Sequence, residues 1–242
     1  MPVRQALAFV LALALPAGLR AQQEPHRDSV AAVINFGLIN TAGNTSTTSL
    51  NGDYAVSYLT GYWTFSQLLA VVYGKTNGAV TAEEYRGGIR AEWAVSRCLS
   101  FYGLGNYYRN RLGGIDHRYE EGTGLLFKAI DQPKQTFNLE AGVSFLQETP
   151  VTDPQNNFTA PRAAAFYKHL LGKTAFFSQA FEVLPDLRRS KDVRLNTETT
   201  LDAPLSTRIA LKVAYVVRFD NEPQPGFKKT DRYLTSGVQV SL

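Results

Sequence analysis

The chain has little of the chemistry on which most enzymes and metal-binding proteins depend. Its 242 residues include one cysteine, Cys98, and three histidines, His26, His117 and His169. A single cysteine excludes an intramolecular disulfide and leaves an ordinary free thiol. The histidines lie in separate parts of the chain, and no G-x-S-x-G sequence surrounds a serine. We therefore predict no catalytic residues, no metal site and no cofactor.

Long apolar runs are also missing after residue 21. No later segment approaches the roughly 18 consecutive apolar residues that a transmembrane helix requires. The formal net charge is only +4 and the basic residues are dispersed, which does not favour nucleic acid as a partner. These absences exclude a helical membrane protein and argue against a nucleic-acid-binding protein.

The N-terminus has the pattern of an export signal. Arg4 precedes an apolar run at 6–15, Pro16 ends this run, and a small residue, Ala21, closes the segment. The run is too short for a membrane anchor, so we predict cleavage after Ala21. The predicted organisation is a signal peptide at 1–21, a polar periplasmic lead-in at 22–29, and one β domain at 30–242.

The rest of the chain alternates apolar and polar residues with a period of two. In the segment 135–148, for example, Phe137, Leu139 and Val143 alternate with polar residues or glycine. This pattern is typical of strands with one apolar face. The predicted strands are 30–41, 46–59, 62–75, 81–95, 99–110, 116–130, 135–148, 159–170, 174–185, 192–202, 207–220 and 229–242.

An even number of such strands behind an export signal predicts an all-β fold, an antiparallel up-and-down transmembrane β-barrel of about twelve strands in the cell outer membrane. Short links follow the even-numbered strands, and mostly longer polar loops, such as 149–158, follow the odd-numbered ones. Barrels inserted from the periplasm show this asymmetry. Ten strands remain an alternative, because the alanine-rich segment 161–171 is compatible with a helix.

Aromatic residues gather near both predicted ends of the strands, as expected at the two membrane–water boundaries. Near the short links lie Tyr58, Tyr62, Trp63, Trp93, Phe137 and Tyr167. Near the long loops lie Phe36, Tyr73, Tyr85, Phe145, Phe219 and Tyr233.

The charged residues decide which face meets lipid. An arginine facing lipid at the midplane costs roughly 2–4 kcal/mol, and a dozen ionisable groups there would exceed a net stability of about 5–15 kcal/mol. The charged face must therefore point inward. The candidate lumen-lining residues are Asp53, Glu84, Arg86, Arg90, Glu92, Glu140, Glu182, Arg194, Glu198, Asp202, Lys212 and Arg218.

Both signs of charge occur in this predicted interior, whereas a pore selective for one sign is expected to carry rings of that sign. Two functions fit the mixture: a narrow, weakly selective channel, or a non-conducting envelope protein whose interior is cross-linked by ion pairs. An outer-membrane hydrolase is the less favoured alternative, because Ser100 and Ser144 lie far in register from the histidines near the strand ends.

Basic residues in the predicted outer loops suggest contact with the phosphates of lipopolysaccharide, which guanidinium groups bind well. The candidates are Arg109, Arg111, Arg188, Arg189, Lys191, Lys228 and Lys229. An ordinary solvated basic rim is the alternative. The other expected partners are outer-membrane lipid and, through the C-terminal strand, the barrel-insertion machinery, although the chain ends in Leu242 rather than an aromatic residue. We expect a monomer.

Several short runs resemble a family of Gram-negative proteins usually labelled salt-induced outer membrane protein, which carries a domain of unknown function. The matching runs are Phe36-Gly37, 40–50, Tyr73–Lys75, Thr81–Arg86, Gly114–Asp116, Arg118-Tyr119, Phe176–Gln179, Leu184–Leu187, 217–223, Pro225-Gly226 and 228–231. They occur in the same order over about residues 33–242. The resemblance implies an outer-membrane barrel and a link to salt or osmotic stress, and it carries no catalytic residues.

Overall fold

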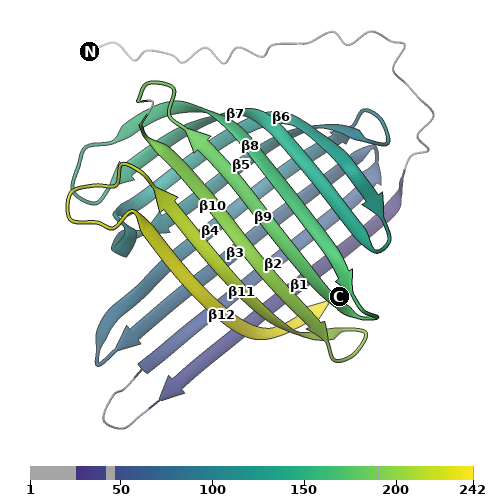
Figure 1. The fold of residues 1–242 in the computed structure, drawn as a ribbon, viewed down its shortest axis with the longest axis horizontal. Helices are drawn as coiled ribbons and strands as arrows, with labels where there is room; N and C mark the ends of the chain where they lie inside the picture. The colour runs from purple at the N-terminus through teal and green to yellow at the C-terminus, as the bar shows by residue number, and fades with distance from the viewer. Residues whose placement is uncertain (1–25, 42–46, 190, 242) are drawn as a thin grey trace.

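The protein forms a closed barrel of twelve antiparallel strands (Figure 1). The computed structural model describes residues 26–41, 47–189 and 191–241. Each strand pairs with its neighbours in sequence, and β1 pairs with β12 to close the barrel. The predicted fold class and strand number are therefore confirmed. The strands are β1 (His26–Thr41), β2 (Thr47–Gly61), β3 (Trp63–Thr76), β4 (Ala79–Ala94), β5 (Leu99–Asn110), β6 (Ile115–Gln132), β7 (Gln135–Pro150), β8 (Asn156–Leu171), β9 (Ala175–Pro185), β10 (Val193–Pro204), β11 (Ile209–Asp220) and β12 (Thr230–Ser241).

Two details differ from the expected boundaries. β1 begins at His26, which pairs with Gly61, so residues 26–29 of the predicted lead-in belong to the strand. β8 includes the alanine-rich segment and pairs with both β7 and β9, which excludes the ten-strand alternative. Strand geometry suits this segment because its alanines alternate, with Ala164 buried inside and Ala163 exposed outside.

Some predictions fall outside the described residues. The signal peptide at 1–21, the first part of the lead-in and the terminal Leu242 lie there, as do residues 42–46 of the resemblance. Within the described part of the chain, no helix is both long and apolar enough to cross a membrane. The one short helix there, η2 (Arg111–Gly113), follows β5.

The connections are short at one end of the barrel and mostly longer at the other (Figure 1). At the long-loop end, residues 186–192 and 221–229 form the longest described connections. The exception is the Asn77-Gly78 turn between β3 and β4, where both residues have positive φ, 50° and 81°. An Asn-Gly pair favours this two-residue hairpin turn because both residues tolerate that backbone conformation.

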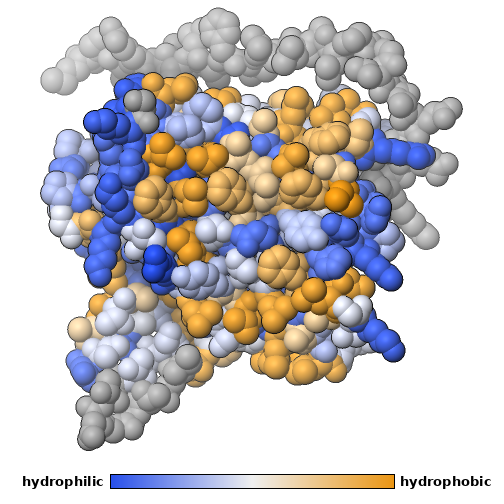
Figure 2. Space-filling view, viewed as in Figure 1, coloured by the Kyte–Doolittle hydropathy of each residue, from blue (hydrophilic) through white to orange (hydrophobic). Residues whose placement is uncertain are grey.

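The outer face of the barrel is largely apolar, with Ile89 at 64% exposure as an example. Figure 2 shows apolar patches on one side of the molecule with a polar band between them. On the outer face of β9 and β10, Gln179 Nε2 donates to Thr197 Oγ1 at 2.6 Å, and Thr199 Oγ1 donates to Gln179 Oε1 at 2.7 Å. These groups satisfy one another, which lowers the free-energy cost of polar groups on this face.

Glu121 is a charged residue on the outer face. It alternates along β6 with the buried Glu120, and it is exposed. It lies two residues from Tyr119, whose ring contacts Tyr107 at a centroid distance of 5.3 Å. An outward glutamate costs less near a membrane boundary, which such aromatic residues typically mark, than at the midplane.

The predicted aromatic positions are mostly on the outer face, with one correction. At the short-link end, the rings of Trp63 and Trp93 stack at a centroid distance of 6.4 Å, and Phe137 contacts Tyr167 at 6.3 Å. Tyr233 instead points inward, where its hydroxyl accepts a hydrogen bond from Asn110 Nδ2 at 2.8 Å. The alternation of β12 requires this, because Arg232 and Leu234 occupy the outward positions.

Candidate functional site: the charged barrel interior

All twelve predicted lumen residues occupy the inward face of their strands. The pairing registers connect them: Asp53 lies opposite Ala70, which lies opposite Arg86, and Asp202 lies opposite Lys212. Contacts across the barrel show that this face points inside. Arg90 of β4 binds Glu140 of β7, and these strands are not neighbours in the sheet.

A dense group of side chains, here named the Tyr102 cluster, fills one side of the interior. Its members are Arg90, Tyr102, Glu140, Arg162 and Glu182. Arg90 donates from Nη2 to Glu140 Oε1 at 2.7 Å, and Arg162 donates from Nη1 to Glu140 Oε2 at 2.5 Å. Arg162 also donates to Glu182 and to the Tyr102 hydroxyl, at 2.7 and 2.9 Å. The Arg90 guanidinium lies 4.3 Å from the centroid of the Tyr102 ring.

Glycines in two neighbouring strands make room for Tyr102, which is fully buried. Gly124 of β6 and Gly142 of β7 lie opposite each other in register. A Cβ atom on Gly142 would lie 2.6 Å from the Tyr102 hydroxyl and would also collide with the Thr123 carbonyl oxygen. Tyr102, the bulkiest side chain of the cluster, therefore packs against glycines, where the two neighbouring strands have no side chain in its way.

A second group, the Glu148 cluster, lies nearer the long loops and consists of Arg118, Glu148, Arg194 and Asp220. The Glu148 carboxylate accepts from Arg118 at 2.5 Å and from Arg194 at 3.3 Å. Arg194 also reaches Asp220 at 3.4 Å and lies 4.3 Å from the centroid of the Phe158 ring. Its Nη1 is buried and has no hydrogen-bond partner among the described residues.

A third group joins β4, β5, β10 and β12. Arg86 Nε lies 3.0 Å from Glu84, and Arg86 Nη1 lies 3.7 Å from Glu198. The Tyr108 hydroxyl donates to Glu84 at 3.3 Å. Asn110 in turn donates from Nδ2 to Tyr108, Asp231 and Tyr233.

The remaining predicted lumen residues are less connected. Lys212 lies 3.4 Å from Asp53, and Glu92 accepts from Arg90 at 2.5 Å. Asp202 has a buried Oδ1 without a hydrogen-bond partner in the described structure. Arg218 has no hydrogen bond and no ion pair with any described residue.

Sequence reasoning missed several inward residues, chiefly Tyr102, Arg118, Glu120, Glu148 and Arg162. The same period-two rule applied to β6 and β7 selects Arg118, Glu120 and Glu148, provided the strand register is known. The rule does not select Arg162, because the alanine-rich sequence around it is compatible with both a helix and a strand. Nothing in the sequence indicates that Arg90 and Arg162 both contact Tyr102.

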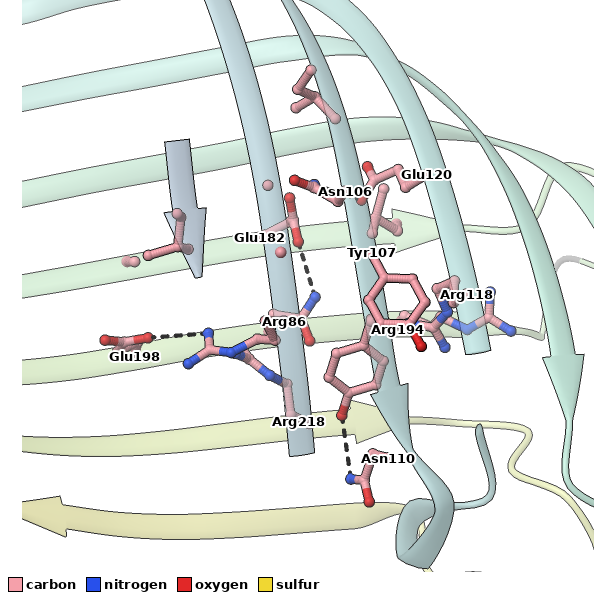
Figure 3. Close-up of a pocket in the computed structure, with 18 of the residues that line it drawn as sticks. Arg86, Asn106, Tyr107, Asn110, Arg118, Glu120, Glu182, Arg194, Glu198 and Arg218 are labelled. Atoms are coloured by element: carbon pink, nitrogen blue, oxygen red, sulfur yellow. Dashed lines mark hydrogen bonds and ion pairs between the residues drawn. The ribbon is translucent and has the colours of Figure 1, made fainter. Parts of the chain in front are cut away.

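A cavity of about 470 Å³ lies inside the barrel and extends toward the long loops. Eight basic and five acidic residues line it, whereas Glu84, Glu140 and Glu148 do not. The side chains of these three acids are at most 9% exposed, and they lie behind the arginines that they bind. Guanidinium groups therefore face the cavity more than carboxylates do (Figure 3).

Some side chains of the predicted basic rim form an ion pair or hydrogen bond within the protein, and others do not. Arg109 and Arg111 both lie near Asp116, at 3.8 and 3.6 Å. Arg189 donates to Asp192 at 2.7 Å and also contacts Asp186. Lys229 Nζ donates to Asn221 at 3.1 Å. The side chains of Arg188, Lys191 and Lys228 make no hydrogen bond or ion pair with the described residues.

Asp192 carries the clearest electrostatic perturbation outside the strands. Its side chain is 1% exposed, and its carboxylate accepts from Arg189. Burial raises the pKa of Asp192 above its ordinary value, more than the attraction of Arg194 lowers it, and the nearby Asp220 and Asp186 add to the rise.

The arrangement needed for hydrolysis is not assembled among the described residues. His117 Nδ1 lies 3.3 Å from Asp116, but no serine is bonded to His117 there. Ser144 Oγ instead donates to Glu120 at 2.6 Å. The described residues also contain no group of three or more potential metal ligands.

A closed barrel with an apolar exterior and a charged interior defines the class: the protein has the fold of porin-like outer-membrane β-barrels. The solved NanC porin has the same fold, with a TM-score of 0.51 at 8% identity, covering 87% of this chain and 97% of that chain. The chain belongs to the family described as protein of unknown function, DUF481, whose model matches residues 34–242. It is also 23% identical over 210 residues to the uncharacterized protein YdiY of Escherichia coli strain K12, covering 86% of this chain and 82% of YdiY.

Proposed function

We propose that the protein is a narrow channel in the outer membrane of a Gram-negative bacterium. The observation that carries this proposal is the cavity of about 470 Å³ inside the closed barrel, lined by ionisable side chains. Charged walls stabilise water and dissolved ions, whereas a purely structural barrel interior has no need of an open charged space. The Tyr102 cluster narrows the passage because it projects from β4, β5, β7, β8 and β9 into the interior.

The test is single-channel recording of the purified barrel in a planar lipid bilayer. We expect small, discrete conductance steps. Replacing Arg90 and Arg162 together by alanine removes two long side chains from the narrow region and should enlarge the steps. Replacing Arg232, which lies on the outer face of β12, by alanine is the control and should leave their size unchanged. A bilayer that stays silent with correctly folded protein would contradict the proposal.

A non-conducting envelope protein is the second candidate. It is favoured by the buried Tyr102 cluster and by the apolar cluster of Leu146, Phe158, Ala160 and Leu184 inside the same barrel. The Tyr102 cluster links β4 and β5 to β7, β8 and β9, and the apolar cluster packs β7, β8 and β9 against one another, so both stiffen the interior. This candidate predicts no conductance steps, together with a weakened envelope when the gene is deleted, measured as increased sensitivity to detergent.

The link to salt or osmotic stress is a separate part of the proposal and rests on the family resemblance of the sequence. It predicts that the amount of protein in outer-membrane fractions rises after a shift to high sodium chloride. An amount that does not change with salt would remove this link and leave the channel proposal intact. The same fractionation tests the proposed location.

A further inference from the structure

Arg218 differs from the other arginines that line the cavity. Arg90, Arg118, Arg162 and Arg194 each donate to a carboxylate at 3.4 Å or less. Arg218 projects from β11 into the same cavity and makes no such contact with any described residue. Its five N–H donors are therefore available to whatever occupies the cavity.

The acids near Arg218 are engaged elsewhere. Asp231 lies directly opposite Arg218 in register, but its carboxylate accepts from Asn110 at 3.3 Å. Glu84 is bound by Arg86 and by the Tyr108 hydroxyl. Glu198 lies within range of the Arg218 charge, but its contact, a long one of 3.7 Å, is with Arg86.

Arg86 faces Arg218 across the cavity. Their strands, β4 and β11, lie on nearly opposite sides of the barrel, and Figure 3 shows both side chains extending into the cavity. Two like charges that face each other repel, and a bound anion relieves that repulsion. Nη1 of Arg194, a residue whose side chain is 5% exposed, adds a buried donor without a partner in the described structure.

We propose that Arg218 and Arg86, with Nη1 of Arg194, form a binding site for a small organic anion. The carboxylate or phosphate group of the anion would bridge the guanidinium groups, which present paired donors that match such oxyanions. The neutral polar residues Asn106, Asn196 and Ser66 line the same cavity and suit the hydroxyl groups of a polar solute. A cavity of about 470 Å³ is within the usual range for small-molecule sites.

The inference rests on the proposed channel, because it assigns a class of solute to the same cavity. The two are separated by measuring equilibrium binding in detergent as well as conduction. We would titrate gluconate, glucose 6-phosphate and glucose into the folded barrel by calorimetry. We expect gluconate and glucose 6-phosphate to bind and uncharged glucose not to bind. If only one of the two anions binds, it identifies the preferred oxyanion.

Arg218→Gln removes the unpaired guanidinium and should weaken anion binding by about tenfold or more, since a charge-assisted hydrogen bond of this kind contributes at least that factor. Arg232→Gln is the matched control, because Arg232 lies on the neighbouring strand near Arg218 but faces outward. It should bind as the wild type does. Unchanged heat-modifiable gel migration verifies that both variants are folded.

The inference would be overturned if the anions bound no more tightly than glucose. It would also be overturned if Arg218→Gln bound the anions with wild-type affinity. Conductance steps without anion binding would retain the channel and reject the site. Anion binding without conductance would retain the site and reject the channel. In a salt gradient, the wild type should prefer anions and Arg218→Gln should lose that preference.

Discussion

The two sides of the barrel interior use arginine in different ways. On the packed side, in the Tyr102 cluster, Arg90 and Arg162 share Glu140 and pack against Tyr102, so their donors are largely satisfied within the protein. On the open side, Arg218 lines the cavity together with Arg86 and has no contacting acid among the described residues. The residue type and the inward position are the same. The difference lies in whether neighbouring strands bring a carboxylate and an aromatic ring to the same level.

This contrast separates a structural role from a binding role. A buried arginine that shares a carboxylate and stacks on a ring cannot offer those donors to a solute without breaking the cluster. An arginine without a protein partner offers its donors at no such cost. Mutations on the packed side should therefore change stability, and mutations on the open side should change solute binding.

The largest predicted effect is on the packed side. Glu140→Ala removes the acid shared by Arg90 and Arg162, whose guanidinium groups then face each other with one acid left for each. Breaking a buried ion pair leaves uncompensated charge, so we expect a loss of roughly 3 kcal/mol in the free energy of unfolding. The measurement is urea unfolding of the barrel in lipid vesicles.

Glu198→Ala is the comparison on the open side. Glu198 is 29% exposed and lies 3.7 Å from Arg86, so its loss should cost about 1 kcal/mol or less. Equal losses for Glu140→Ala and Glu198→Ala would show that the two sides do not differ in packing.

A smaller effect is predicted for Gly142, one of the two glycines that make room for Tyr102. Gly142→Ala places a methyl group against the Tyr102 hydroxyl and the Thr123 carbonyl, and overpacking of this kind costs about 1–3 kcal/mol. Gly103→Ala is the control, because a Cβ there would meet no atom within 4 Å. The same urea measurement should show destabilisation for Gly142→Ala alone. Tolerance of both alanines would mean that Tyr102 is not held tightly.

Much of the fold could be predicted because a barrel in lipid imposes a simple rule on every strand. Alternation placed Arg86, Arg90, Arg194 and Arg218 on one face without any knowledge of their partners. Tyr233 was misplaced because an aromatic ring near a strand end suits either face. Its inward position follows from the alternation of β12 and agrees with the pairing register, in which it lies opposite the buried Val216 of β11.

The partners within the interior could not be predicted from the sequence. Glu140 and Arg90 are 50 residues apart, and their contact depends on the tilt of the strands and on the number of strands between them. Arg218 is indistinguishable from Arg90 in its local sequence pattern, yet one is paired and the other is not. Local periodicity defines a face, whereas the distance across a barrel is a property of the closed structure.

A further prediction concerns Asp192, a buried acid beside Arg194. It lies 3.5 Å from Arg194, and burial raises its pKa. A carboxyl whose pKa is higher in the folded state binds its proton more tightly there, so its contribution to stability falls as the pH rises from about 3.8 through the folded-state pKa.

Asp192→Asn should remove this contribution. The difference in unfolding free energy between wild type and variant should therefore change across that window, in the direction that favours the wild type at the acidic end. Urea unfolding at several pH values measures the difference. A difference that is independent of pH would mean that Asp192 is not perturbed by burial.

The smallest predicted effect concerns the basic rim, where an ion-paired arginine follows directly after one without an ion pair. Arg189 is bound to Asp186 and Asp192, whereas the side chain of Arg188 makes no hydrogen bond or ion pair with the described residues. Phosphate groups of lipopolysaccharide should therefore bind Arg188 and Lys191 in preference to Arg189, because the guanidinium of Arg189 is already ion-paired within the loop. Replacing Arg188 and Lys191 by serine should modestly lower the lipopolysaccharide that remains with the barrel during purification, measured by phosphate content. Arg189→Ser should loosen the loop and retain the lipopolysaccharide; the reverse result would show that ion pairing within the loop does not decide which rim residues bind.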